Sequence, residues 1–380
     1  KAALAGGAPI VPGLEGAATD VKTFAKKADE VGYPVLIKAS AGGGGKGMRR
    51  VDSAGELPDA LEGAAREAAK AFGDNRIYLE KYLVNPRHIE VQVFGDTHGA
   101  VAHLFERECS IQRRHQKIIE ETPSAALTPE LREQICEAAV QVAQAARYYS
   151  AGTVEFLYDD SGAFYFLEMN TRLQVEHPIT ELVTGLDLVA EQIRVAAGEK
   201  LSAELLGATQ RGHAIECRIY AEDAENNFFP SSGVLRRYVE PSGPGLRIDS
   251  GVAEGSVVGI DYDPILAKVV TYGETREAAR LRMIDALKRY TILGVKTCNR
   301  YLIDILERPE FIAGKTHTAF IDAVMPEIAA PSEEEIHAAV AASALALETT
   351  VQRRPATGAR EEVSVTPWET LGGWRLGEER

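Results

Sequence analysis

The sequence has few cysteines, few basic residues and no long apolar run. Its four cysteines, among 380 residues, form no CxxC pair, which is typical of free thiols in a reducing compartment. No stretch approaches the ~18 apolar residues of a membrane span, so we expect no membrane partner. The 42 Lys and Arg stand against 56 Asp and Glu, which gives a net charge of −14. An acidic surface disfavours nucleic acid as the main partner.

The remaining composition is that of a large globular enzyme. Hydrophobic residues make up 45% of the chain, enough to bury a sizeable core, and the length predicts two or three domains. Short strands paired as antiparallel hairpins, without regular crossover helices, indicate an α+β fold. Long helices are expected at about 129–147 and 331–348. We expect a cytosolic enzyme, or a piece of one.

A glycine-rich segment from Ala41 to Met48 follows an apolar run that predicts a buried strand. It formally matches G-x-G-x-x-G, but a short strand rather than a helix is expected after it, which disfavours a dinucleotide site. Lys46 is followed by glycine rather than Ser or Thr, which disfavours a P-loop. A glycine flap between two strands remains, where backbone N–H groups and Lys38 could meet phosphates. The alternative is a mobile surface loop.

The segment GTVEFLYDDSGAFYFLEMN predicts a hairpin with two opposed glutamates. A turn centred between Ser161 and Gly162 places Glu155 opposite Glu168 on one face. Directly opposed like charges are destabilising, so the pair needs a shared proton or a cation. Oxygen ligands beside a phosphate loop favour Mg²⁺ or Mn²⁺. The alternative is a pair of solvated glutamates in a shifted register.

Polar residues continue beyond this hairpin. The strand alternation past Glu168 would place Asn170, Arg172, Gln174 and Glu176 on one face, lining a cavity for a small anion. Glu176, beside a histidine, is a candidate general base. The segment 106–121 clusters Arg113, Arg114, His115 and Lys117 around Gln112, which suits phosphate or bicarbonate. Cys109, in the same segment, is interpreted as a structural thiol rather than a nucleophile.

Six strings, taken together, resemble biotin carboxylase. They are KASAGGGGKGM, EKYLVNPRHIEVQV, ERECSIQRRHQKIIEE, GTVEFLY, FLEMNTRLQVEHPITE and GHAIECRIYAED, and they follow in order over about residues 8–325. Other ATP-grasp enzymes, such as carbamoyl-phosphate synthetase, share the glycine flap and the acidic metal ligands but not RRHQK or NTRLQVEH. The resemblance implies an α+β ATP-grasp fold with a glycine-flap lid subdomain, followed by the biotin carboxylase C-terminal subdomain.

The resemblance also implies roles for individual residues. Glu155, Glu168 and Asn170 match the metal site, and Glu176 matches the base that deprotonates bicarbonate. Arg218 matches the arginine that stabilises the biotin enolate, and Arg247 matches a dimer-interface arginine. The bicarbonate and phosphate site is matched by Lys117, Arg172, Gln174 and Val175. The nucleotide site is matched by Lys38, Gly42, Gly43, Gly44, Gly45, Glu80, Lys81, Leu83, His88, Gln112 and His115.

The implied reaction is carboxylation of biotin with ATP and bicarbonate, through carboxyphosphate. It is the first half-reaction of an acyl-CoA carboxylase, an enzyme of fatty-acid metabolism. The implied partners are a biotin carrier domain, a carboxyltransferase subunit and further copies of this chain. Because no AMKM-like string is present, we expect the biotinyl lysine on another domain. The compartment would be the cytoplasm, or the mitochondrial matrix in a eukaryote.

The implied domains are a remnant of the junction with an N-terminal subdomain at 1–14, the lid at 15–82, and the ATP-grasp core with the C-terminal subdomain at 83–325. Residues 326–380 would form a helix, a linker and the start of a further domain. We expect the family's Rossmann-like N-terminal subdomain, with one more ATP-contacting lysine, to precede Lys1. Two alternatives remain: an ATP-grasp ligase for another acceptor, and a non-catalytic nucleotide-binding scaffold fragment.

Overall fold

The computed structural model describes residues 2–14, 21–41, 48–114, 116–159, 161–325 and 332–352. The chain divides into two compact units, Lys1–Ile328 and Ala329–Arg380. The first unit holds two main antiparallel sheets, one of four strands and one of eight. Among the described helices, none combines the length and apolarity that a membrane span requires.

The four-stranded sheet has the strand order β1-β4-β2-β3. Its strands are β1 (Gly13–Leu14), β2 (Val35–Ala39), β3 (Arg49–Val51) and β4 (Ile77–Lys81). The apolar alternation of β2 buries Val35, Ile37 and Ala39 against α2 (Val21–Val31) and α3 (Leu57–Phe72). The short strand expected after the glycine-rich segment is therefore confirmed as β3. This sheet carries Lys38 and Glu80.

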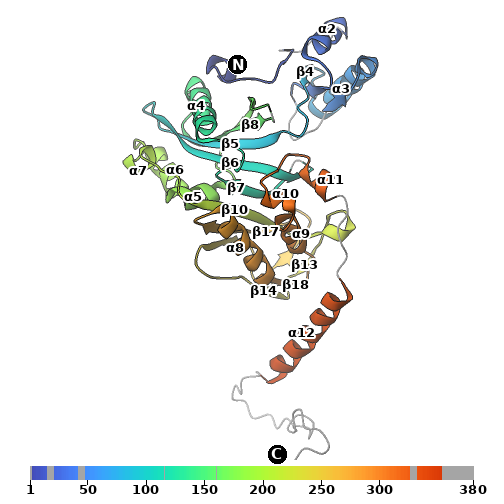
Figure 1. Ribbon diagram of the computed structural model, residues 1–380, viewed down its shortest axis with the longest axis vertical. Coiled ribbons are helices and arrows are strands. Elements are labelled where there is room, and N and C mark those ends of the chain that lie inside the picture. The colour runs from blue at the N-terminus through green and yellow to red at the C-terminus, as the bar shows by residue number, and fades with distance from the viewer. Residues whose placement is uncertain are drawn as a thin grey trace, which may run out of the picture. The chain divides into compact units, whose positions relative to one another are not determined.

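The eight-stranded sheet runs β15-β17-β10-β7-β6-β5-β8-β9, and every adjacent pair is antiparallel. Figure 1 shows β5, β6, β7 and β10 following one another across the molecule. The bounds are β5 Arg87–Gly95, β6 Val101–Arg113, β7 Gln116–Thr122, β8 Ser150–Tyr158, β9 Phe164–Asn170, β10 His213–Tyr220, β15 Leu246–Ser250 and β17 Ile265–Gly273. The α+β class predicted from the hairpins is confirmed.

Helices cover both faces of this sheet. On one face, which we call the back face, α4 (Pro129–Ala145) packs on β5 and β6, and α8 (Arg276–Arg289) packs on β10 and β17. On the other, the front face, α5 (His177–Thr184) packs against β6, β7, β10 and β17. Strand β5 is consequently buried on both sides. Its apolar residues Ile89, Val91 and Val93 face α4, while His88, Glu90 and Gln92 face the front.

Adjacent glutamates on β7 point to opposite faces. Glu121, on the back face, pairs with His213 at 2.8 Å and with Arg276 of α8 at 2.6 Å. Burial alone would raise the pKa of Glu121, but the hydrogen bond from His213 and the charge of Arg276 lower it to about 2. Glu120 faces the front, beside Arg218. Strand β7 therefore contributes one buried glutamate to each face of the sheet.

The β8–β9 hairpin pairs Glu155 with Glu168, as the sequence predicts, but by a different route. Next to the turn, Tyr158 pairs with Phe164 and Phe156 with Phe166, which centres the turn on Ser161. A bulge then leaves Leu167 without a partner and restores the predicted pairing one step further along. The predicted turn centre is therefore half a residue off, and the bulge compensates for the error.

Other local expectations are confirmed or corrected. The predicted helix at 129–147 is α4, with Thr128 capping it through Leu131 N at 3.3 Å. A 3₁₀ turn at Ala54–Glu56 precedes α3, which ends at Gly73 with φ +70°. Glu56 accepts from Asp52 N rather than from Ser53 N, at 3.1 Å, and the Ser53 side chain bonds no backbone N–H, so Ser53 does not cap this turn.

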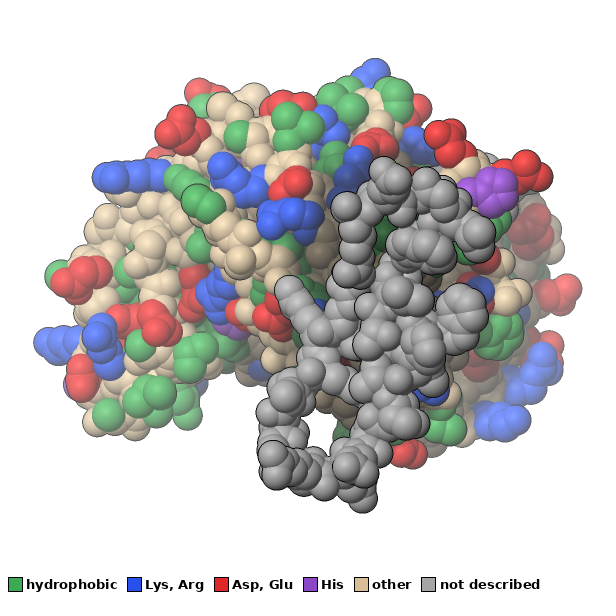
Figure 2. All heavy atoms as spheres, turned by 90° about the horizontal axis from the view of Figure 1, so that it is seen from below, with side chains coloured by type: hydrophobic (Ala, Val, Ile, Leu, Met, Phe, Trp, Pro, Cys, Tyr) green, Lys and Arg blue, Asp and Glu red, His purple; other side chains and the backbone are tan. Residues whose placement is uncertain are grey.

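The remaining helices and strands of the described residues belong to both units. They are α1 Ala2–Ala5, α6 Leu188–Ala196, α7 Ala203–Leu206, β11 Glu222–Asp223, β12 Phe229–Pro230, β13 Gly233–Val234, β14 Arg237–Val239, β16 Val257–Val258, β18 Thr291–Leu293, α9 Asn299–Leu306, α10 Pro309–Ile312, α11 Phe320–Val324 and α12 Glu333–Gln352. The helix expected at 331–348 is thus confirmed as α12. Figure 2 shows acidic and basic side chains interspersed on the displayed face.

Candidate active site

Lys117, on β7, is the centre of a buried polar cluster on the front face. Its Nζ atom contacts Glu90, and it lies 2.9 Å from Glu155 and 2.7 Å from Glu176. Burial alone would lower the pKa of Lys117, but the carboxylates, led by Glu90, raise it well above the usual value. The amine therefore stays charged and holds three carboxylates from three different elements together.

Glu176 immediately precedes α5 and is held from two sides. Its Oε1 accepts from Lys117, and its Oε2 accepts from the Arg218 guanidinium at 3.0 Å. Arg218 lies on β10 and also pairs with Glu120 at 2.6 Å. The side chain of Glu176 is only 2% exposed. A fixed carboxylate with one cation on each oxygen is positioned to accept a proton from a small acid bound beside it.

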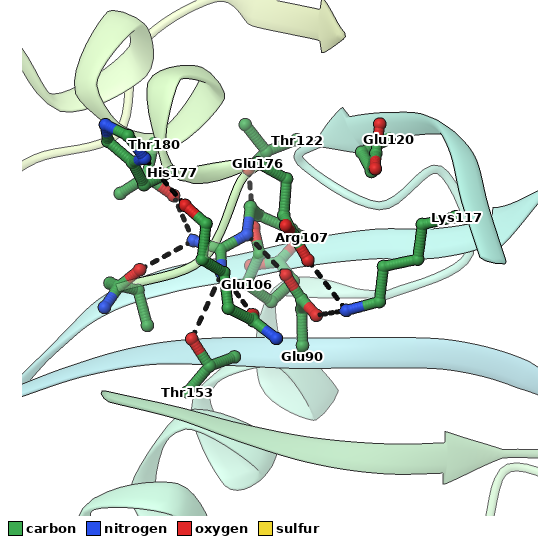
Figure 3. Close-up of polar contacts among 12 residues, drawn as sticks. Glu90, Glu106, Arg107, Lys117, Glu120, Thr122, Thr153, Glu176, His177 and Thr180 are labelled. Carbon is green, nitrogen blue, oxygen red and sulfur yellow. Dashed lines mark hydrogen bonds and ion pairs between the residues drawn. The ribbon is translucent and has the colours of Figure 1, made fainter. Parts of the chain in front are cut away.

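Arg107, on β6, is fully buried beneath this cluster. Figure 3 shows its polar contacts. Its guanidinium donates to Glu90 at 2.6 Å and to Gln92 at 2.8 Å. Three further acceptors surround it: Thr180 at 3.0 Å, Gln174 at 3.2 Å and Thr153 at 3.3 Å. The five acceptors come from β5, β8, α5 and the segment before α5. Arg107 therefore fixes the elements that carry the cluster relative to one another.

Glu155 joins the cluster to a second group of side chains. His88 Nε2 lies 2.8 Å from Glu155 Oε2, and Gln112 hydrogen bonds to the other nitrogen of the His88 ring. Asn170 and Gln174 donate to Glu155 Oε1 at 2.9 and 3.0 Å. Burial alone would raise the pKa of Glu155, but His88 and Lys117 outweigh it and hold the pKa below its usual range. Glu155 is therefore an anion at any physiological pH.

The donor set at the opposed glutamates fits a hard divalent cation. Glu168 is exposed, and Asn170 Nδ2 contacts it at 3.5 Å, so its carboxylate can accept another ligand. His88, Glu90 and Glu155 also lie close enough together to hold an ion, but Lys117 already contacts two of them. The carboxylates of Glu155 and Glu168 with the amide oxygen of Asn170 form an all-oxygen set suited to Mg²⁺.

The predicted nucleotide residues of the four-stranded sheet form a group of their own. Lys38 pairs with Glu80 across β2 and β4 and lies 5.8 Å from the Tyr78 ring centre. Lys81 donates to the carbonyls of Gly32 and Tyr33 at 2.8 and 3.0 Å, and Leu83 follows β4 in a half-buried position. Gly42, Gly43, Gly44, Gly45 and His115 lie outside the described residues.

The segment between β9 and α5 is not a strand, so the predicted alternation through Glu176 is wrong. Strand β9 ends at Asn170, and a turn then brings Gln174 and Glu176 into the cluster. Arg172 instead is exposed and contacts only the Leu173 carbonyl at 3.4 Å within the described residues. Val175 is 38% exposed, and its carbonyl accepts from Lys268 Nζ of β17 at 3.0 Å.

The predicted gathering of basic residues at 106–121 is also only partly correct. Arg113 pairs with Glu222 at 2.5 Å and stacks on Phe228, 4.2 Å from its ring centre. Arg114 donates to Asn227 at 2.8 Å. The β6–β7 turn, with Arg114 at φ +50°, directs both arginines toward residues 222–228, while Lys117 enters the cluster. The two arginines therefore hold a neighbouring loop.

The cysteine interpretation is confirmed. All four cysteines are free and buried. Burial raises the pKa of the Cys109 thiol well above its ordinary value, and the charge of Glu90 adds to this. Cys109 is therefore a protonated, inert thiol, although it lies beside the cluster.

Sequence reasoning missed three residues of the cluster: Glu90, Arg107 and Glu120. Glu90 carried a signal, since it lies between His88 and Gln92 on the polar side of a strand with an apolar opposite side. Arg107 and Glu120 carried none, because their partners come from strands distant in the sequence. The structure brings together the predicted residues His88, Gln112, Lys117, Glu155, Asn170, Gln174, Glu176 and Arg218.

Comparison with known proteins agrees with this geometry. Residues 1–204 match the family described as carbamoyl-phosphate synthase L chain, ATP binding domain, and residues 216–323 match the biotin carboxylase C-terminal domain. The chain is 48% identical over 317 residues to biotin carboxylase 1 of Bacillus subtilis, in a match that covers 83% of this chain and 70% of that protein. It is 50% identical over 319 residues to the mitochondrial methylcrotonoyl-CoA carboxylase subunit alpha of Glycine max.

That second match covers 84% of this chain but 44% of the soybean protein, so the chain spans less than half of that relative. Among solved structures, it resembles the biotin carboxylase domain of Hydrogenobacter thermophilus 2-oxoglutarate carboxylase, in complex with MgADP, ADP and bicarbonate. The identity is 46% and the TM-score 0.81, over 87% of this chain and 73% of that one.

The eight-stranded antiparallel sheet, the smaller sheet with its lysine and glutamate, and the paired carboxylates define an ATP-grasp domain of the ligase class. The chain belongs to the biotin carboxylase family.

Proposed function

We propose that this chain carboxylates biotin with ATP and bicarbonate, as the first half-reaction of a biotin-dependent acyl-CoA or pyruvate-type carboxylase. The observation that carries the proposal is Glu176, held between Lys117 at 2.7 Å and Arg218 at 3.0 Å. A base flanked by two cations suits an anionic substrate that must lose a proton and then carry developing negative charge.

In the proposed reaction, Glu176 takes the proton of bicarbonate, whose oxygen attacks the γ-phosphorus of ATP and releases ADP. Lys117 offsets charge on the phosphoryl oxygens. The carboxyphosphate formed breaks down to CO₂ and phosphate, which removes the ureido proton of biotin. Arg218 then stabilises the enolate that captures CO₂. Mg²⁺ or Mn²⁺, held by Glu155, Glu168 and Asn170, would neutralise charge on the nucleotide phosphates.

The remaining residues and domains take their roles from the same proposal. Residues 15–82 would act as the lid, with Lys38 and the glycines from Gly42 to Gly45 on phosphates. Glu80, Lys81, Leu83, His88, Gln112 and His115 would surround the rest of the nucleotide. Arg172 and Val175 would complete the bicarbonate site with Gln174. Residues 1–14 would lead in from a preceding subdomain, 83–325 would form the core and C-terminal subdomain, and 326–380 would lead toward a further domain.

The proposed partners are a biotin carrier domain, a carboxyltransferase subunit and further copies of this chain. The related soybean protein is named as mitochondrial. We propose the mitochondrial matrix as the compartment if the source is a eukaryote, and the cytoplasm otherwise.

The decisive experiment measures ADP release by the full-length protein with ATP and Mg²⁺, with and without bicarbonate and free biotin. We expect release to require bicarbonate, to rise with biotin and to collapse in Glu176→Gln. Glu204→Gln, an exposed glutamate on α7, is the matched control and should match the wild type. Bicarbonate-dependent release that ignores biotin would favour a ligase for another acceptor. No turnover with retained ATP binding would favour the scaffold alternative.

A further inference from the structure

Two fully buried glutamates lie directly opposite each other behind Arg218. Glu120 on β7 pairs in register with Glu216 on β10, and neither has any exposed surface. Directly opposed residues have Cβ atoms about 4.5–5.5 Å apart, so the two carboxyl groups are close neighbours. The carboxyl group of Glu120 stands apart from the contacts between Glu90 and Lys117 (Figure 3).

Three of the four carboxyl oxygens in this pair lack a donor among the described residues. Glu120 Oε1 accepts from Arg218 Nε at 2.6 Å. Glu120 Oε2 and both oxygens of Glu216 are buried without a hydrogen-bond partner in the part of the chain that the structure describes. An ionised carboxylate in that position would be a buried charge with no compensation, which proteins avoid by neutralising the group.

Among the described residues, Arg218 is the one cation in direct contact with the pair, while Lys268 and Lys117 act on it only through their charge at longer range. Arg218 is shared with Glu176. Lys117 contacts Glu90, Glu155 and Glu176, and Lys268 contacts the Val175 carbonyl and Asp249 at 3.1 Å. On the β17 side the neighbour of Glu216 is apolar: Val270 lies opposite it and clusters with Ala214, Ile179 and Val183. Two charged carboxylates therefore cannot both be balanced there.

We propose that Glu120 and Glu216 hold one proton between them and together position Arg218, with Glu216 as a neutral acid and Glu120 as the anchor of the guanidinium. The inference deepens the proposed function, on which the role of Arg218 depends. When Glu176 takes a proton from bicarbonate, its hold on Arg218 weakens. Glu120 then keeps the guanidinium in place for biotin.

The direction of the pKa shifts agrees with this arrangement. Burial, and then the charge of Glu120, raise the pKa of Glu216 well above its ordinary value. Burial also raises the pKa of Glu120 to about 7, against the opposing charge of Arg218. Above about pH 7 the pair therefore holds one proton. At lower pH Glu120 also becomes neutral, and Arg218 loses its anchor.

The test compares Glu120→Gln, Glu120→Asp and Glu216→Gln in the full-length protein. Glu120→Gln should raise the KM for biotin about tenfold, the typical loss when a group supporting a site residue is removed, with the KM for ATP unchanged. Glu120→Asp should recover part of that loss. Glu216→Gln replaces a neutral acid by a neutral amide, so its KM for biotin should stay within about threefold of the wild type. The wild-type KM for biotin should rise below about pH 7, a dependence that Glu120→Gln removes.

Infrared difference spectroscopy gives a readout that needs no turnover. The wild type at neutral pH should show a protonated carboxyl band that disappears in Glu216→Gln and remains in the control Glu204→Gln. Absence of that band, or equal loss of biotin use in Glu216→Gln and Glu120→Gln, would overturn the proposal. An unchanged KM for biotin in Glu120→Gln would also overturn it. If biotin has no effect on ADP release by the wild type, the proposed function fails independently of this inference. The infrared band would still show whether the glutamate pair holds a proton.

Discussion

Arg107→Met should destabilise the first unit severely. The substitution removes a fully buried cation with five acceptors and leaves Glu90 with Lys117 as its remaining cationic contact among the described residues. Breaking a buried ion pair by deleting one partner costs about 3–5 kcal/mol, because the other charge stays buried. We expect a loss of that size in the free energy of unfolding. Arg107→Lys keeps the charge but has only three donors, so it should lie in between.

The assay is urea unfolding followed by circular dichroism. Tryptophan fluorescence would report elsewhere, because Trp368 and Trp374 both lie beyond the first unit. Arg66→Met, at an exposed arginine, is the control and should change stability by less than about 0.5 kcal/mol. In combination with Glu90→Gln, the loss should be smaller than the sum of the single losses. A cost below about 1 kcal/mol for Arg107→Met would refute the argument that this residue fixes the cluster.

Three further predictions concern the exposed Glu168, the buried Glu120 and the four cysteine thiols. Glu168→Gln should weaken Mg²⁺ binding about tenfold or more, as measured by calorimetry with MgADP. Stability should change little, because the Glu168 side chain is exposed. Unchanged Mg²⁺ affinity would contradict the metal assignment. Since the pKa of Glu120 is raised to about 7, the folded state holds a proton that the unfolded state loses near pH 4.5, so the contribution of Glu120 to stability should fall as pH rises from 4.5 to 7, by up to about 3 kcal/mol. In urea unfolding, the change in stability between pH 4.5 and 7 should differ between the wild type and Glu120→Gln by that contribution, because Glu216 titrates in both proteins; the same slope in both proteins would sink the idea. Native protein should resist iodoacetamide at all four buried thiols, whereas protein in urea should be alkylated at each, as mass spectrometry can count; rapid labelling of the native protein would disprove the burial argument.

The sequence predicted those parts of the site that depend on local geometry. The Glu155–Glu168 pairing, for instance, follows from the register of one hairpin. The bulge at Leu167 could not be foreseen, because the sequence of that strand contains no glycine or proline at the irregular position. The prediction reached the right pair because the bulge offset the misplaced turn.

Residues that act across several strands were beyond such reasoning. Arg107 reads as one charge in a polar segment, and its importance arises from acceptors on β5, β8 and α5. The neighbouring Arg113 and Arg114 look equally suited to an anion, yet a turn directs them to another loop. Local composition indicates that cations are present, whereas the fold decides which of them meets a carboxylate.

The two glutamates at the end of β7 form a natural pair of internal reporters. They are chemically identical and adjacent in sequence, yet the pKa of Glu120 is about 7 and that of Glu121 about 2. Both are buried, so burial does not account for the difference. Glu121 has an arginine and a histidine to itself, while Glu120 shares one arginine with another acid. The labelled carboxyl groups of Glu120 and Glu121 should therefore titrate at well-separated pH values. Each would report on its own face of the sheet.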